Sequence, residues 1–198
     1  MKNNTNQHTQ LQSMVIAALL CAVGIVIPMF APRIVLEPAS YTLASHVPIF
    51  IALFISPPVA LAVAVGTTIG FLFAGFPLVV VIRALSHVVF ALIGALLLKK
   101  KPNTLTTLGG TAMFSLLLSV LHAVSEVFVV TLFYFGNSMT AQYYNKGYFE
   151  TVIILVGVGT VVHSLIDFGI AAFVWKPLTR VVRIPYNAKI KLQQKAEV

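Results

Sequence analysis

Charged side chains are scarce in this sequence. Of its 198 residues, 59% are hydrophobic and only 9% are Asp, Glu, Lys or Arg, whereas charged residues make up about 25% of an ordinary soluble domain. So little charge cannot cover the surface of a soluble fold, and the composition predicts an integral membrane protein in the lipid bilayer. Because a transmembrane helix takes about 20 apolar residues, the chain holds about five or six helices and no soluble catalytic domain.

Cysteines and catalytic motifs are also nearly absent. The one cysteine, Cys21, lies in the first apolar run, which excludes an internal disulfide and any site that needs several cysteines. The sequence contains no Gly-x-Ser-x-Gly, no His-Glu-x-x-His and no Walker-type phosphate-binding motif. We therefore expect that the chain is not an enzyme and that it carries no ATP site or other cofactor.

The apolar sequence is divided into six runs, which predict an all-α bundle of six transmembrane helices in a single membrane domain. The second and third runs are separated only by Ser-Pro-Pro, and proline disfavours helix at this point. Each of these two runs is shorter than a comfortable span, so a re-entrant hairpin or one broken span over 43–74 are alternatives. The runs cover residues 11–31, 43–55, 57–74, 77–98, 108–135 and 150–175.

Positively charged residues lie almost entirely on one side of this six-helix arrangement. Ten Lys and Arg residues, in the N-terminus, the 99–107 loop and a basic tail over 176–198, share one side, while only Arg33 and Lys146 lie on the other. Since cytoplasmic loops carry the excess of Lys and Arg, we predict that both termini and the tail are cytoplasmic. The net charge of +8 is then a topology signal, and no nucleic-acid partner is expected.

Six ionisable residues inside the predicted helices form three pairs with a spacing of four residues. This spacing puts both members of a pair on one face of a helix. Ionisable groups within a membrane are costly and by default mark a functional site. We therefore predict a polar cluster inside the bundle, with His46 near its outer mouth. The pairs are Arg83/His87, His122/Glu126 and His163/Asp167.

The cluster has two main interpretations. In the first, Arg83 pairs with Glu126, and the polar groups only fix the register of the helices. In the second, Glu126 pairs with its neighbour His122, and the planar guanidinium of Arg83 binds the carboxylate of a ligand through two parallel hydrogen bonds. We favour the ligand pocket and expect the outer loops to cover it, although tyrosines there are also typical of an interfacial aromatic belt. The predicted ligand-binding residues are Arg83, His87, His122, Glu126, His46, Tyr41, Asn137 and Tyr144.

Two further functions use the same residue types. Histidine and carboxylate groups bind zinc, nickel or cobalt. However, no helix carries two histidines at ligand spacing and Arg83 would repel a cation, so we expect no metal. A proton relay through His163, Asp167, His122 and Glu126 would suit a self-sufficient, proton-coupled carrier of a small organic anion. The lack of a convincing internal repeat disfavours this alternative.

Small residues form a stripe along the first helix. Ala18 and Ala22 lie four residues apart, with Ala17 and Cys21 beside them. A surface of small side chains lets another helix approach closely. The stripe therefore predicts a helix-docking surface, for which packing within the bundle is the alternative.

These features together resemble a known family. The stretches PASYTLASHVPIFIALFISP and GFPLVVVIRALSHVVFALIGALLLKK, with the Ala-x-x-x-Ala stripe, are similar to the substrate-binding S components of energy-coupling factor (ECF) vitamin transporters, of the niacin and pantothenate type. The resemblance implies a plasma-membrane protein that captures a carboxylate-bearing vitamin, either niacin or pantothenate, outside the cell. It also implies three partners for ATP-driven uptake, a transmembrane scaffold subunit and two cytoplasmic ATPase subunits. The scaffold would dock on Ala18, Ala22, Ala17 and Cys21.

Overall fold

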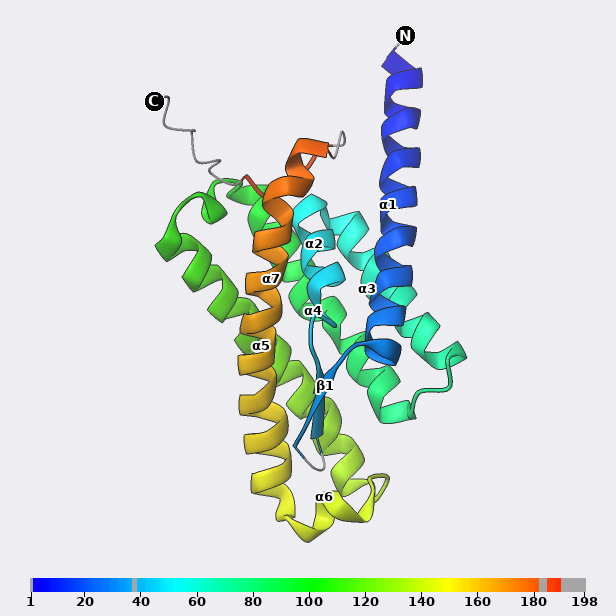
Figure 1. The fold of residues 1–198 in the computed structure, drawn as a ribbon, viewed down its shortest axis with the longest axis vertical. Helices are drawn as coiled ribbons and strands as arrows, with labels where there is room; N and C mark the ends of the chain where they lie inside the picture. The colour runs from blue at the N-terminus through cyan, green and yellow to red at the C-terminus, as the bar shows by residue number, and fades with distance from the viewer. Residues whose placement is uncertain (1, 37–38, 182–184, 190–198) are drawn as a thin grey trace.

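The structure is a computed structural model that describes residues 2–36, 39–181 and 185–189. It is a bundle of helices with one β-hairpin inserted after the first helix (Figure 1). The helical membrane fold is confirmed, with the correction that it is not purely α-helical, because β1 and β2 form an antiparallel pair. The elements are α1 (Lys2–Phe30), β1 (Arg33–Leu36), β2 (Ala39–Thr42), α2 (Val47–Ile55), α3 (Pro57–Phe73), α4 (Leu78–Lys100), the 3-10 helix η1 (Thr104–Thr106), α5 (Leu108–Phe135), α6 (Ala141–Asn145), the π-helix η2 (Phe149–Val158) and α7 (Gly159–Val181).

Four helical segments among the described residues are long and apolar enough to cross a membrane. They are Gln7–Phe30, Leu78–Lys100, Leu108–Phe135 and Phe149–Val181, the last formed by η2 and α7 together. The helix α2 is much shorter, since nine residues extend over about 14 Å against a hydrocarbon core of about 30 Å. All of its residues are buried. The apolar sequence of α2 therefore reflects its place in the core of the bundle.

The start of α2 is held by a carboxylate from α7. Asp167, which is fully buried, accepts hydrogen bonds from the backbone N–H groups of Ala44 (2.8 Å) and His46 (2.9 Å). A helix N-terminus has unpaired N–H groups and a positive dipole end, and a carboxylate satisfies both. Ala44 has a φ of 65°, in the left-handed region. These contacts explain why α2 begins at Val47 and not at residue 43, where the apolar run starts.

The far end of α2 is completed by a segment from the C-terminal part of the chain. Pro58 has no N–H to bond the carbonyl of Phe54, four residues earlier. Instead, the N–H groups of Asn187 and Ala188 donate to that carbonyl, at 3.1 and 3.0 Å. Trp175 of α7 donates its indole N–H to the carbonyl of Ala188 at 3.2 Å, and Ala188 is fully buried. Part of the basic tail is therefore packed into the fold.

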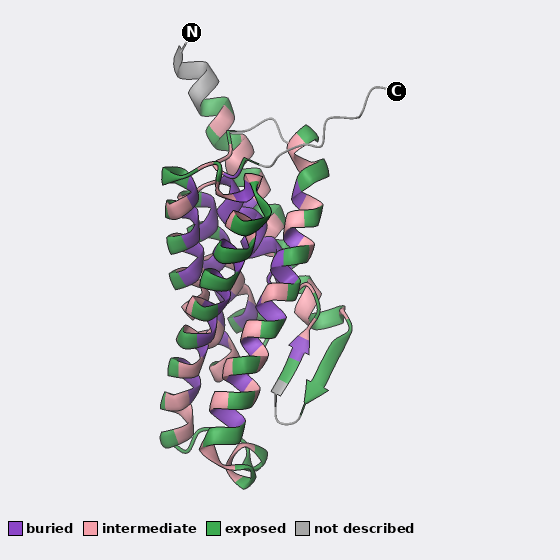
Figure 2. Cartoon of the chain, turned by 90° about the vertical axis from the view of Figure 1, so that its left-hand side faces the viewer, coloured by how far each residue is buried: buried purple, intermediate pink, exposed green. Residues whose placement is uncertain are grey.

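The helix α1 packs on α3 through small side chains. The Cys21 thiol lies 3.6 Å from the carbonyl oxygen of Ala62, and Gly66 faces Cys21 so closely that a Cβ there would overlap with its sulfur. Small residues at such a contact allow two helices in a membrane to approach. Ala17 is buried in the same core, whereas Ala18 and Ala22 remain exposed. Figure 2 shows buried positions between the helices and exposed ones along their outer faces. The structure thus divides the predicted docking stripe into an internal and an external half.

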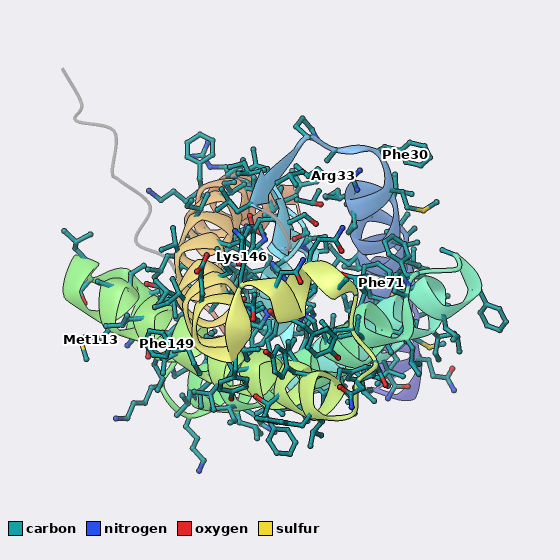
Figure 3. The ribbon with its side chains drawn as sticks, turned by 90° about the horizontal axis from the view of Figure 1, so that it is seen from below. Phe30, Arg33, Phe71, Met113, Lys146 and Phe149 are labelled. Atoms are coloured by element: carbon teal, nitrogen blue, oxygen red, sulfur yellow. The ribbon has the colours of Figure 1, made fainter. Side chains whose placement is uncertain are left out.

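The basic clusters share one end of the bundle. The first turns of α1, the α4–α5 connection and the last turns of α7 lie at the top of Figure 1, and α6 lies at the bottom. The lysines 99–101 therefore lie at the same end as Arg180, whereas Lys146 and Arg33 appear in the view from below (Figure 3). The basic residues Arg183, Lys191 and Lys195 of the predicted cytoplasmic side lie outside the described residues.

Candidate ligand-binding site

A cavity lies between the hairpin and the helices of the bundle, and it is lined by residues from α1, β1, β2, α2, α3, α4, α5 and α7. Its volume is about 320 Å³, which lies at the small end of the range for small-molecule sites, about 300–1,000 Å³. One wall is aromatic, because the rings of Phe71 and Phe76 stack at 4.6 Å with an interplanar angle of 26°. The lining also contains polar side chains, among them Arg83, His87 and Glu126. The cavity can therefore hold a small ligand with one flat apolar part and one polar part.

The polar part of the lining contains a buried ion pair. Arg83 of α4 donates from Nη2 to Oε2 of Glu126 in α5 at 2.7 Å, and Thr160 of α7 donates to the same oxygen at 2.7 Å. Glu126 is only 3% exposed. Here the structure agrees with the first interpretation of the cluster, in which Glu126 pairs with Arg83. Arg83 keeps other donors, since a guanidinium has five N–H groups and its buried Nε–H has no partner among the described residues.

Four histidines from four separate segments meet beside this pair. The ring of His46 lies at the centre, with centroids 4.6 Å from His122 and 4.9 Å from both His87 and His163. His46, His87 and His163 line the cavity, and His122 is fully buried behind them. Asp167, 3.1 Å from His46 Nδ1 and 3.4 Å from His163 Nε2, supports two of the rings.

The hairpin closes the cavity through Tyr41. Its hydroxyl donates to the carbonyl of Leu155 in η2, and burial raises the pKa of Tyr41 to about 12, so the phenol stays protonated. The π-helix η2 supplies this acceptor, and π-helical turns often occur at functional sites. Tyr41 is therefore both a wall of the cavity and the contact that fixes the hairpin.

Two predicted ligand residues lie elsewhere. Tyr144 donates its hydroxyl to the carbonyl of Tyr134 and accepts from the N–H of Met139, both at 3.2 Å, within the connection between α5 and η2. Asn137, with a φ of 51°, forms the turn after α5. Neither lines the cavity described here. Their bonds organise the loop itself, which is why being in an outer loop did not bring them to the ligand site.

The cavity also contains residues that the sequence analysis did not select. Arg33 in β1 lines it, is exposed, and forms no ion pair with any described residue. It could have been found from the sequence, because it is one of only two cations on its side of the predicted bundle. Nothing in the sequence pattern marks Thr160 or the Phe71/Phe76 pair. With Arg33 and Arg83 against the single carboxylate of Glu126, the lining carries an excess of positive charge.

The chain is similar to one characterised transporter over nearly its whole length. It is 35% identical to the niacin transporter NiaX of Lactococcus lactis subsp. cremoris (strain MG1363), in an alignment of 196 residues that covers 96% of this chain and 87% of the relative. No protein-family model matches the chain, and no solved structure matches it. The similarity and the four long apolar helices together identify a multi-pass protein of the cell membrane.

Proposed function

The chain belongs to the niacin-type S-component family that includes the niacin transporter NiaX, and we propose that it captures niacin outside the cell for ATP-driven uptake by ECF partner subunits. In this proposal the chain binds and presents the vitamin and catalyses no reaction. The outer mouth of the cavity is the hairpin side, and the vitamin enters there.

The observation that carries this proposal is the excess of positive charge in a cavity that also has an aromatic wall. Niacin is a pyridine ring with one carboxylate. The carboxylate matches the two arginines, since arginine binds carboxylate through parallel hydrogen bonds. The flat ring matches Phe71 and Phe76, because aromatic rings stack with an offset. Pantothenate, the other vitamin implied by the sequence resemblance, also has a carboxylate but has no ring for this wall.

Comparison of niacin with its amide tests the role of the carboxylate. We expect nicotinamide to bind at least tenfold more weakly, about 1.4 kcal/mol, because it brings no negative charge to Arg33 and Arg83. Isothermal titration calorimetry of the purified protein measures both affinities. Arg33→Gln should reduce the preference for the acid and leave the buried pair of Arg83 intact, whereas Lys146→Gln, which removes an outer cation away from the cavity, should not. Equal affinities for acid and amide in the unmodified protein would contradict the proposal.

The orientation in the membrane is part of the same proposal. We infer that six helices cross the bilayer, α2 and α3 being the short ones, and that both termini are cytoplasmic. In a Cys21→Ala background, a cysteine at residue 146 should react in intact cells with a thiol reagent that does not cross membranes. A cysteine at residue 100 should react only after the cells are opened. Labelling of residue 100 in intact cells would show that the orientation is the reverse of the proposed one and that the cavity opens to the cytoplasm.

The partner surface is proposed on the external half of the α1 stripe. Ala18 and Ala22 are exposed, whereas Ala17 is buried and Cys21 is half-buried against α3, so we place the docking contact on Ala18 and Ala22. Ala22→Trp should therefore hold a partner helix away and abolish ATP-driven uptake, with niacin binding nearly unchanged. Leu19→Trp, on an exposed position outside the stripe, is the matched control.

Two outcomes would count against this assembly. Loss of niacin binding by Ala22→Trp, with partner association preserved, would place Ala22 inside the bundle. Uptake of niacin into vesicles that contain this chain alone would favour the self-sufficient, proton-coupled carrier instead.

A further inference from the structure

The two carboxylate oxygens of Glu126 have different surroundings. Oε2 accepts short hydrogen bonds from Arg83 and Thr160. Oε1 faces the Nε2 atoms of His87 and His122, each at 3.4 Å. Charge-assisted N–H···O bonds are about 2.7–2.9 Å long, so both contacts are too long for good hydrogen bonds. Two ligand atoms bound tetrahedrally to zinc, each at about 2.0–2.1 Å, are separated by about 3.3–3.4 Å. The spacing around Oε1 therefore suits an ion placed between these atoms.

His46 completes this set. Its Nδ1 lies 3.1 Å from Oδ2 of Asp167, which leaves Nε2 for another partner. A carboxylate that holds one imidazole nitrogen while the other binds a metal is the usual support for a histidine ligand. One ligand atom from each of His46, His87, His122 and Glu126 lies within 4.8 Å of all the others.

His122 supplies an independent observation. Its side chain is fully buried, with a relative exposure of 0%. Its Nδ1 lies 3.3 Å from the hydroxyl of Ser164, but its Nε2 has no hydrogen-bond partner among the described residues. Buried polar atoms without partners are rare in folded proteins, and each one calls for an explanation. A metal ion at the centre of the four side chains would give this nitrogen its partner.

We propose that His46, His87, His122 and Glu126 bind a divalent transition-metal ion of the zinc class. Neutral imidazoles and a carboxylate suit such ions. The charge of Arg83 is directed at Oε2, so it leaves Oε1 available to the ion. The sequence predicts no metal, because no helix carries two histidines at ligand spacing and Arg83 would repel a cation, but the fold brings the ligands together from three segments, the turn before α2, α4 and α5.

A second group, His46, His163 and Asp167, is the competing position. Asp167 is less available as a ligand, because its oxygens already accept hydrogen bonds from two backbone N–H groups at the start of α2. We therefore place the ion on the Glu126 side. This inference stands apart from the proposed function, since it concerns the metal alone.

Direct titration tests the proposal. The full-length protein is purified without a polyhistidine tag, treated with a chelator, and titrated with Co²⁺ and then with Zn²⁺. We expect one equivalent of Co²⁺ to bind with the visible absorption of a tetrahedral site, and Zn²⁺ to displace it. Failure of both ions to bind at micromolar concentration, or binding of Co²⁺ without this absorption, overturns the proposal. The niacin affinity of the chelator-treated protein is measured separately, so either result leaves the proposed function to its own test.

Substitutions then assign the ligands. His122→Gln should weaken Zn²⁺ binding by at least about a hundredfold, since even the residues that support metal ligands contribute about 10–100-fold. His163→Gln, in the same cluster but outside the Glu126 group, should leave the affinity within about threefold. His87→Gln, at a less buried position, provides a second ligand deletion if His122→Gln does not fold. Unchanged affinity in a folded ligand variant, or loss only in His163→Gln, overturns the assignment.

Discussion

Replacing Glu126 with glutamine should destabilise the protein by about 3 kcal/mol and abolish niacin binding. Removal of one partner from a buried ion pair costs about 3–5 kcal/mol, because the other charge is left without compensation. We expect the lower end of this range, since the side chain of Arg83 is 20% exposed to the cavity while that of Glu126 is 4% exposed. Thr160 would also lose its charged acceptor. Unfolding in mixed detergent micelles measures the change in stability, and calorimetry measures binding.

The same substitution at Glu150 provides the control. Glu150 pairs with Lys146 at 3.5 Å, but their side chains are 56% and 45% exposed. Exposed ion pairs contribute about 0–1 kcal/mol, so Glu150→Gln should change neither stability nor binding measurably. The double variant Arg83→Met, Glu126→Leu should recover much of the stability lost in Glu126→Gln, because no charge is left buried, but it should not recover niacin binding. Wild-type stability of Glu126→Gln would contradict the buried pair.

The spacing of polar residues predicted the cluster but not its internal pairing. A four-residue interval determines that Arg83 and His87 share a face of α4, as the structure shows. It says nothing about which faces of different helices meet. Glu126 had Arg83, His87 and His122 as candidate partners, and only the packing of α4 against α5 brings the guanidinium to 2.7 Å. The convergence of four histidines on His46 depends on the same contacts between helices.

The hairpin and the short helix α2 were harder to predict for a different reason. Two strands of four residues each are not stable alone, so local sequence preference gives little signal for them. Their position depends on distant partners, Leu155 for Tyr41 and Asp167 for the backbone before α2. Long apolar helices were predictable because their length and hydrophobicity are properties of one continuous segment.

The contact between Gly159 and Tyr41 makes the hairpin sensitive to one methyl group. A Cβ at residue 159 would overlap with the phenol of Tyr41, so Gly159→Ala must displace this ring and with it the hairpin over the cavity. We expect niacin affinity to fall at least tenfold, about 1.4 kcal/mol. Alanine favours helix over glycine by about 1 kcal/mol, so the loss cannot come from weakening α7.

Two comparisons isolate the steric effect of Gly159→Ala. Gly169→Ala makes the same change in the same helix, at an exposed site where a Cβ would meet nothing within 4 Å, and it should leave binding unchanged. In a Tyr41→Ala background the collision no longer exists, so Gly159→Ala should cause little further loss of affinity. A double-mutant cycle on niacin binding measures this coupling. Additive losses, or equal affinities for the two glycine variants, would show that the position of Tyr41 does not control the cavity.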